Sequence, residues 1–152
     1  MTDETTPDGA RDASPETTSP EMSEARARGL RTMTEVYGFD MSDGPGDFFA
    51  HTADHLFAEV WTRPGLSHRD RRLLLLGALT AQGNTDVADI QVGAALANGE
   101  LTPDELEEIA LFLCYYAGWP GGTKLNNVIG PHVARARKAA RQASEEAEAG
   151  RD

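Results

Sequence analysis

The chain has 152 residues, which is enough for one domain with a single hydrophobic core. Its formal net charge of −11 disfavours a nucleic-acid partner and an anionic membrane surface, because both bind through clustered Lys and Arg. Hydrophobic residues make up 39% and charged residues 26%, a balance typical of a soluble globular protein.

The two ends of the chain differ in composition from the middle. Residues 1–21 hold six acids, one base and almost no apolar side chain, so burial cannot offset the entropy cost of ordering them. We therefore expect a disordered acidic tail there and a helical domain over residues 22–140. The alanine- and charge-rich stretch 141–152 is expected to continue the last helix and to fray.

A single cysteine, Cys114, excludes a disulfide within the chain. Because the N-terminus is also polar and unlike a signal peptide, we expect the protein in a reducing cytoplasm. The most apolar run, residues 73–81, is far shorter than the roughly 20 residues that a membrane-spanning helix needs. It is expected to be a buried helix.

Caps and helix breakers along the chain predict helices and no convincing strand. Ser67 with Asp70 has the spacing of a capping box, and Thr102-Pro103 followed by acids is the clearest helix start in the sequence. The predicted class is an all-α, single-domain bundle of about six helices. They are expected over about 22–37, 47–62, 67–82, 84–98 and 102–117, and from about 123 onward with a kink at Pro131.

His51, His55 and Glu59 are spaced four residues apart and share one face of a predicted helix. Two histidines at this spacing can bind one metal ion, with the glutamate as a third ligand. The alternative, which we favour, is a polar stripe that faces water or a neighbouring subunit. We therefore predict no metal site.

Arg71 shares a helix face with Leu74, Leu75 and Ala78, which predicts an apolar environment for its side chain. An unpaired buried charge costs several kcal/mol, so Arg71 must meet a carboxylate or line a polar cavity. It either binds a substrate carboxylate through its planar guanidinium or forms a structural ion pair with Glu59 or another acid of the core. An exposed arginine in the first helical turn is the third possibility.

Gln91 is expected on or beside the buried face of its helix, among Val87, Ile90, Ala94 and Ala95. A buried amide needs hydrogen-bond partners. Gln91 therefore either lines a wet pocket or hydrogen-bonds to neighbouring backbone.

Cys114 is followed by the aromatic group Tyr115, Tyr116 and Trp119. A lone cysteine flanked by leucines is more often a small buried apolar side chain than a nucleophile. The aromatic residues form either a pocket wall, with a tyrosine hydroxyl as proton donor, or part of the core.

Four segments, in this order, resemble the carboxymuconolactone decarboxylase family. The first is similar to the family signature Glu-Val-Trp-Ser-Arg-Pro-Gly-Leu, and the resemblance covers about residues 30 to 138. The segments are Phe57-Ala-Glu-Val-Trp-Thr-Arg-Pro-Gly-Leu66, Ala94-Ala-Leu-Ala-Asn-Gly99, Thr102-Pro-Asp-Glu-Leu106 and Tyr116-Ala-Gly-Trp-Pro120.

This resemblance implies an all-α, alkyl hydroperoxidase D-like fold whose helices pack between subunits of a trimer or hexamer. The namesake activity of the family is the cofactor-free decarboxylation of a carboxylated muconolactone in the breakdown of aromatic acids. A related peroxidase branch uses a Cys-x-x-Cys motif with a histidine four residues further on.

The sequence departs from that pattern at three positions. Counting back from Asn98-Gly99, the two cysteines of the peroxidase branch fall on Asn84 and Val87, and the histidine falls on Gln91. Thiol–disulfide exchange needs a thiolate and a resolving partner. A thiol-dependent hydroperoxide reductase is therefore disfavoured.

The leading expectation is a cofactor-independent lyase that acts on a small carboxylated or lactone metabolite. In this hypothesis Arg71 anchors a carboxylate, Gln91 stabilises the developing enolate and Tyr116 donates the proton. Glu59 orients Arg71, and Trp61 and Trp119 form the substrate-binding walls. The alternative is a non-catalytic, oligomeric small-molecule-binding protein, because glutamine cannot shuttle protons as histidine does.

Overall fold

The computed structural model describes residues 22–151, and these residues form six α-helices and one π-helix without a strand. The expected all-α class and the number of helices are confirmed, whereas the predicted tail over residues 1–21 lies outside the described residues. The helices are α1 (Glu24–Tyr37), α2 (Asp47–Ala50), η1 (His51–Val60), α3 (His68–Gln82), α4 (Thr85–Ala97), α5 (Pro103–Tyr116) and α6 (Trp119–Ala149).

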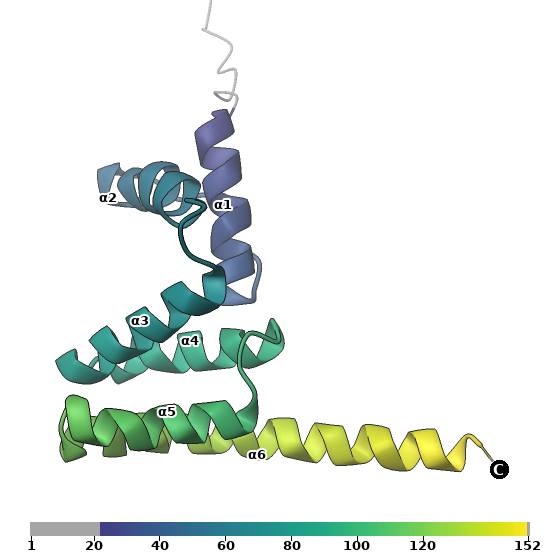
Figure 1. The fold of residues 1–152 in the computed structure, drawn as a ribbon. Coiled ribbons are helices and arrows are strands. Elements are labelled where there is room, and N and C mark those ends of the chain that lie inside the picture. Colours follow the sequence, from purple (N-terminus) through teal and green to yellow (C-terminus); the bar gives the residue numbers. More distant parts are fainter. Residues whose placement is uncertain (1–21, 152) are drawn as a thin grey trace, which may run out of the picture.

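Figure 1 shows the helices in three groups along the molecule. At one end α1 packs against η1, in the middle α3 lies beside α4, and at the other end α5 lies beside the first part of α6. The rest of α6 projects past α5 as a single helix (Figure 1). Helices α4 and α6 also pack against each other, so the middle and last groups form one unit.

The apolar side chains form two cores, one on each side of α3. The larger core lies among α3, α4, α5 and α6 and includes Leu76, Val92, Leu106, Leu125 and Ile129. The smaller core lies between α1 and η1 and includes Met33, Val36, Ala53, Phe57 and Trp61. Leu75 of α3 packs against both cores, which places their junction at this helix.

Local signals in the sequence set most helix ends. Ser67 with Asp70 and Thr102 with Glu105 each form a complete capping box, in which each partner satisfies a backbone N–H of the other. Gly38 and Gly83 end α1 and α3 in the left-handed conformation, with φ of 76° and 73°. These predicted boundaries are confirmed.

The helix expected over residues 47–62 has a different geometry from the predicted one. After the four residues of α2 it continues as the π-helix η1, and the backbone N–H of Trp61 donates to the carbonyl of Leu56 at 2.9 Å. In this wider turn, residues four and five apart share a face, so Ala53, Phe57 and Ala58 are all buried. Such segments occur frequently at functional sites.

The last helix also begins earlier than expected, at Trp119. Pro120 lies in its first turn, where a missing N–H leaves no hydrogen bond unmade, and the helix runs through Pro131 to Ala149. Although α6 has 31 residues, neither it nor any other described helix has an apolar stretch long enough to cross a bilayer.

The close packing of α1 on η1 gives a test of the fold. A Cβ atom on Gly29 would lie 1.9 Å from the carbonyl oxygen of Ala53, so Gly29→Ala should lower the free energy of unfolding by about 1–3 kcal/mol. A Cβ atom on Gly77 would lie 3.9 Å from its nearest neighbour, an atom of the Leu113 side chain. Gly77→Ala should therefore raise the free energy of unfolding by about 0.5–1 kcal/mol. Urea unfolding measures the free energy of unfolding of both variants. If the two substitutions changed it equally, the packing of α1 on η1 would be contradicted.

Candidate active site

A pocket of about 510 Å³ opens where the two cores meet, a volume in the usual range for small-molecule sites. Its inner wall is aromatic and aliphatic, and exposed apolar side chains form its rim. Arg71 is the one charged residue among the described residues that line it. The lining residues are Tyr37, Leu56, Phe57, Val60, Trp61, Arg71, Leu74, Leu75, Val87 and Gln91.

The Arg71 side chain is half-buried and is held by the loop before α3. Its Nη2 donates to the carbonyl of Arg63 at 2.7 Å, and its Nη1 donates to the carbonyl of Leu66. No carboxylate among residues 22–151 forms an ion pair with it. Arg71 therefore brings a positive charge to the pocket that no described acid neutralises.

The buried arginine of α3 is Arg72, which was not predicted from the sequence. Arg72 has no exposed side-chain surface, whereas Leu74, which was expected to share a buried face with Arg71, is 65% exposed. The expected register of α3 is therefore wrong by one residue. The cause is the run of four leucines at 73–76, which offers an apolar side chain to every face and leaves the buried one undefined.

Arg72 joins three segments through hydrogen bonds from its guanidinium. Its Nε and Nη2 each donate to Glu100 at 2.9 Å, Nη2 also donates to the carbonyl of Val36 at 2.7 Å, and Nη1 donates to Oε1 of Gln91. Glu100 is the counter-charge of this buried cation. Burial alone would raise the pKa of Glu100, but the hydrogen bonds from Arg72 and Asn98 outweigh burial and hold this pKa below its usual value.

Gln91 is buried, as predicted, and its amide has a defined orientation. Because a guanidinium only donates hydrogen bonds, the atom of Gln91 that faces Arg72 must be the oxygen. The amide nitrogen has no hydrogen-bond partner within residues 22–151, and no fully buried side-chain polar atom there lacks a partner. The nitrogen therefore keeps a small exposed surface, although the residue as a whole is buried, and Gln91 is one of the residues that line the pocket.

Tyr37, at the end of α1, brings a hydroxyl group to the same pocket. Its ring packs against Phe57, with 5.3 Å between ring centroids. Burial raises the pKa of Tyr37, and the nearby charge of Arg72 offsets part of this rise, so the hydroxyl stays protonated at neutral pH. Tyr37 was not predicted as a site residue, because no local motif distinguishes it from other aromatic residues at helix ends.

Of the other predicted site residues, Trp61 lines the pocket but Glu59 does not. The carboxylate of Glu59 faces solvent and contacts Nδ1 of His55 at 2.7 Å, so the expected orientation of Arg71 by Glu59 is wrong for this chain. The side chains of His55 and Glu59 lie one turn apart on the exposed face of η1. Among residues 22–151, no three His, Cys, Asp or Glu side chains are placed to hold a metal ion.

Tyr116 and Trp119 lie outside the pocket that contains Arg71. Tyr116 is 78% exposed and stacks on Phe112, and Trp119 packs edge-on against Tyr115. Trp119 also lines a separate groove of about 250 Å³ together with Cys114. They cannot join Arg71 within one chain, because α5 and α6 are on the far side of the larger core. Roles for these residues in turnover stay predictions.

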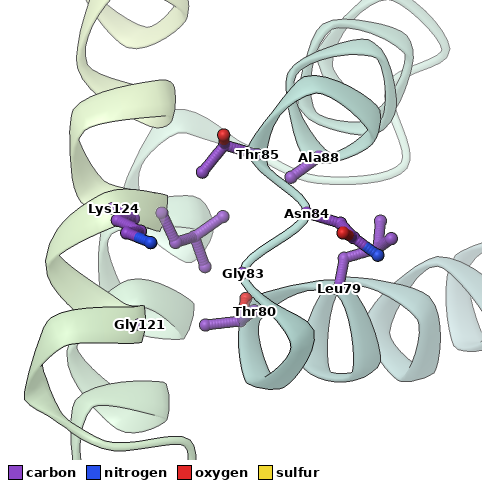
Figure 2. A pocket seen from close by; sticks show the side chains of 9 residues that line it. Leu79, Thr80, Gly83, Asn84, Thr85, Ala88, Gly121 and Lys124 are labelled. Carbon is purple, nitrogen blue, oxygen red and sulfur yellow. The ribbon is translucent and has the colours of Figure 1, made fainter.

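Figure 2 shows the turn between α3 and α4, where the resemblance would place the first thiol of a peroxidase. Asn84 stands there and donates to Oε1 of Gln82 at 2.9 Å. The cavity between this turn and α6 measures about 10 Å³, which is room for one water molecule at most. This position offers no thiol.

Comparison with known proteins identifies the family. The model of the "Carboxymuconolactone decarboxylase family" matches residues 46–130. The chain belongs to this family. The 4-carboxymuconolactone decarboxylase of Acinetobacter baylyi is 35% identical over 101 residues, which are 61% of this chain and 75% of that protein. No solved structure matches significantly. The segment matched to the carboxymuconolactone decarboxylase family contains every pocket-lining residue except Tyr37.

The ion pair beneath the pocket can be tested by its pH dependence. Glu100→Gln leaves the Arg72 guanidinium buried without a counter-charge, so it should lower the free energy of unfolding by about 3–5 kcal/mol at pH 7. Because folding lowers the pKa of Glu100, the stabilisation is complete above its unfolded value of about 4.3 and is lost as the pH falls through the folded value.

Urea unfolding of wild type and Glu100→Gln between pH 7 and pH 3 measures this effect. The difference in unfolding free energy should shrink as the pH falls below about 4. A difference that stays constant over the whole range would contradict the assignment of Glu100 as the counter-charge of Arg72.

Proposed function

We propose that this protein is a cofactor-independent, decarboxylase-like lyase that acts on a small carboxylated or lactone metabolite in the Arg71 pocket. The observation that carries the proposal is a mostly apolar pocket lined by both the guanidinium of Arg71, which has no described carboxylate partner, and the amide of Gln91, whose nitrogen has no hydrogen-bond partner among the described residues. Membership of the carboxymuconolactone decarboxylase family, and the similarity to a 4-carboxymuconolactone decarboxylase, support this class of activity.

Arg71 binds an anionic or carbonyl oxygen of the substrate through its planar guanidinium. An ion pair to the carboxylate that leaves would stabilise the substrate more than the transition state and would slow the reaction. Arg71 therefore acts best on an oxygen that stays in the product. The leaving carboxylate then lies against the apolar wall that includes Leu74 and Val87, where no described cation stabilises it.

The chemical step breaks the bond between the carboxylate carbon and its neighbour and releases CO₂. The electron pair stays with the substrate as an enolate, whose oxygen accepts a hydrogen bond from the amide nitrogen of Gln91. Tyr37 donates the proton to the new carbanion carbon and regains one from water. Tyr37 thus takes the role first expected of Tyr116, because its hydroxyl belongs to the same pocket as Arg71.

The alternative, a small-molecule-binding protein without catalysis, is favoured by one observation. Gln91 occupies the position where the family resemblance implies a histidine, and an amide does not take up or release protons near neutral pH. Such a protein would bind the same acids through Arg71 and leave them unchanged.

Arg71 variants test the proposed role. Arg71→Ala should lower kcat/KM for a panel of lactone acids by about 30-fold or more, because it removes one partner of a desolvated ion pair. Arg71→Lys keeps the charge but loses the two-pronged hydrogen bond and should fall between wild type and Arg71→Ala. CO₂ release without added cofactor is the measurement, and Arg141→Ala, on the exposed end of α6, is the charge-matched control.

Three outcomes discriminate the hypotheses. Turnover by wild type that Arg71→Ala leaves unchanged would place the active site elsewhere. Binding without turnover, lost in Arg71→Ala, would favour the non-catalytic alternative. If wild type neither binds nor turns over any lactone acid, both the lyase hypothesis and the binding-protein hypothesis are contradicted.

We also propose that the protein is a homo-oligomer, a trimer or a hexamer. Five large apolar or aromatic side chains are more than half exposed along α5 and the start of α6, a density that is unusual for a monomer surface. They are Leu111, Phe112, Tyr115, Tyr116 and Trp119.

Light scattering tests the assembly. Wild type should scatter as a multiple of the 16.4 kDa chain, and Phe112→Lys should shift it towards the monomer because a charge would enter the apolar interface. A wild-type monomer at micromolar concentration would contradict the proposal. Ala134→Lys, on the exposed side of α6, controls for the added charge.

A further inference from the structure

We infer that Arg72 sets the hydrogen-bonding polarity of the pocket by fixing which group of the Gln91 amide faces the ligand. The site therefore accepts a ring acid with a carbonyl oxygen opposite Gln91 and rejects a ring acid with a hydrogen-bond donor at that position. The inference rests on the proposed function, because it concerns the ligand of the same pocket. Arg72 acts as a positioning residue, because it does not line the pocket and affects the ligand only through Gln91.

The orientation of the Gln91 amide cannot reverse while Arg72 is in place. Rotating the amide by half a turn would bring its NH₂ group against the guanidinium, so that two donors would face each other in a buried site. The guanidinium cannot move to relieve this contact, because Glu100 and the carbonyl of Val36 hold its other nitrogens. The reversed amide would lose one hydrogen bond and leave a buried donor unsatisfied.

The other side chains of the pocket leave few acceptors for a ligand. Arg71 and the indole of Trp61 only donate, and the remaining lining residues except Tyr37 are apolar. No described carboxylate lines the pocket. A ligand group that can only donate hydrogen bonds would therefore stay unpaired opposite Gln91. An unpaired buried donor lowers the affinity more than the loss of one contact does.

These properties define a ligand class. The ligand has an acidic or carbonyl oxygen for Arg71, an apolar ring against Phe57 and Trp61, and a ketone or lactone oxygen for Gln91. Amino acids of the same shape are excluded, because their ammonium group has no acceptor opposite the Gln91 amide.

Three probes with one carbon ring test the inference by isothermal titration calorimetry. They are 4-oxocyclohexanecarboxylate, which carries an acceptor, cyclohexanecarboxylate, which carries neither group, and trans-4-aminocyclohexanecarboxylate, which carries a donor. Wild type should bind the oxo acid about tenfold more tightly than the unsubstituted acid and should bind the amino acid most weakly.

Gln91 variants should change this order in different ways. Gln91→Glu presents a carboxylate oxygen to the pocket and should reverse the order, so that the amino acid binds more tightly than the oxo acid. Gln91→Leu removes the group and should leave the oxo and unsubstituted acids within about twofold of each other. Circular dichroism confirms that each variant is folded.

Arg72→Lys tests the role of Arg72 itself. Lysine keeps the charge beside Glu100 but cannot hold Glu100, Val36 and Gln91 together, so the amide is free to turn. The affinity ratio of oxo acid to amino acid should fall by about fivefold or more, a change that mere loss of stability would not produce. If this variant does not fold, the wild-type order of the three probes still tests the role of Arg72, because an amide that Arg72 did not fix could turn and accept a hydrogen bond from the amino acid.

The results separate this inference from the proposed function. If wild type binds all three acids equally, and Arg71→Ala abolishes that binding, the polarity inference is overturned while the acid-binding site stands. If no acid binds and Arg71→Ala changes nothing, both the polarity inference and the proposed function are overturned. A reversed order in Gln91→Glu supports both.

Discussion

The buried guanidinium of Arg72 is the constraint on which the rest of this structure depends. It is fully removed from solvent, and its hydrogen bonds reach the end of α1, the middle of α4 and the segment between α4 and α5. A buried cation costs several kcal/mol unless its charge and all its donors are satisfied, so these segments must meet at one place. That place is the junction of the two hydrophobic cores, and the pocket opens beside it.

Neighbouring arginines on α3 have different roles because successive helix residues point about 100° apart. Arg72 points between the cores, where Glu100 neutralises it, and Arg71 points to the rim, where it meets two backbone carbonyls and no described carboxylate. Arg72 therefore organises the fold, and Arg71 supplies a positive charge to the pocket. Gln91 connects them, because its oxygen is held by Arg72 and its nitrogen borders the pocket that Arg71 lines.

The sequence predicts the features of this protein that depend on local interactions. The capping box at Ser67, the helix start at Thr102 and the ends of α1 and α3 depend on residues within four positions of each other, and all are confirmed. Gln91 is buried as predicted, although of the four apolar neighbours that predicted its burial only Ala94 and Ala95 are themselves buried. Family membership was predicted from four short segments and is confirmed by the match over residues 46–130.

The features that the sequence does not predict depend on contacts between distant segments. The leucine run in α3 satisfies several helix registers, and only Glu100, 28 residues away, selects Arg72 as the buried arginine. The π-helix η1 is not distinguishable from an α-helix by its apolar pattern, and Tyr37 joins the pocket only when α1 packs on η1. Tyr116 and Trp119 are near the family landmarks in sequence, but the larger core separates them from Arg71.

A crystal structure of the protein with a bound lactone acid tests the central claim most directly. We expect ligand density in the pocket between the two cores, with an acidic oxygen on the guanidinium of Arg71 and a carbonyl oxygen within hydrogen-bonding distance of the Gln91 amide nitrogen. Density in the groove beside Cys114 and Trp119, with the Arg71 pocket empty, would contradict it.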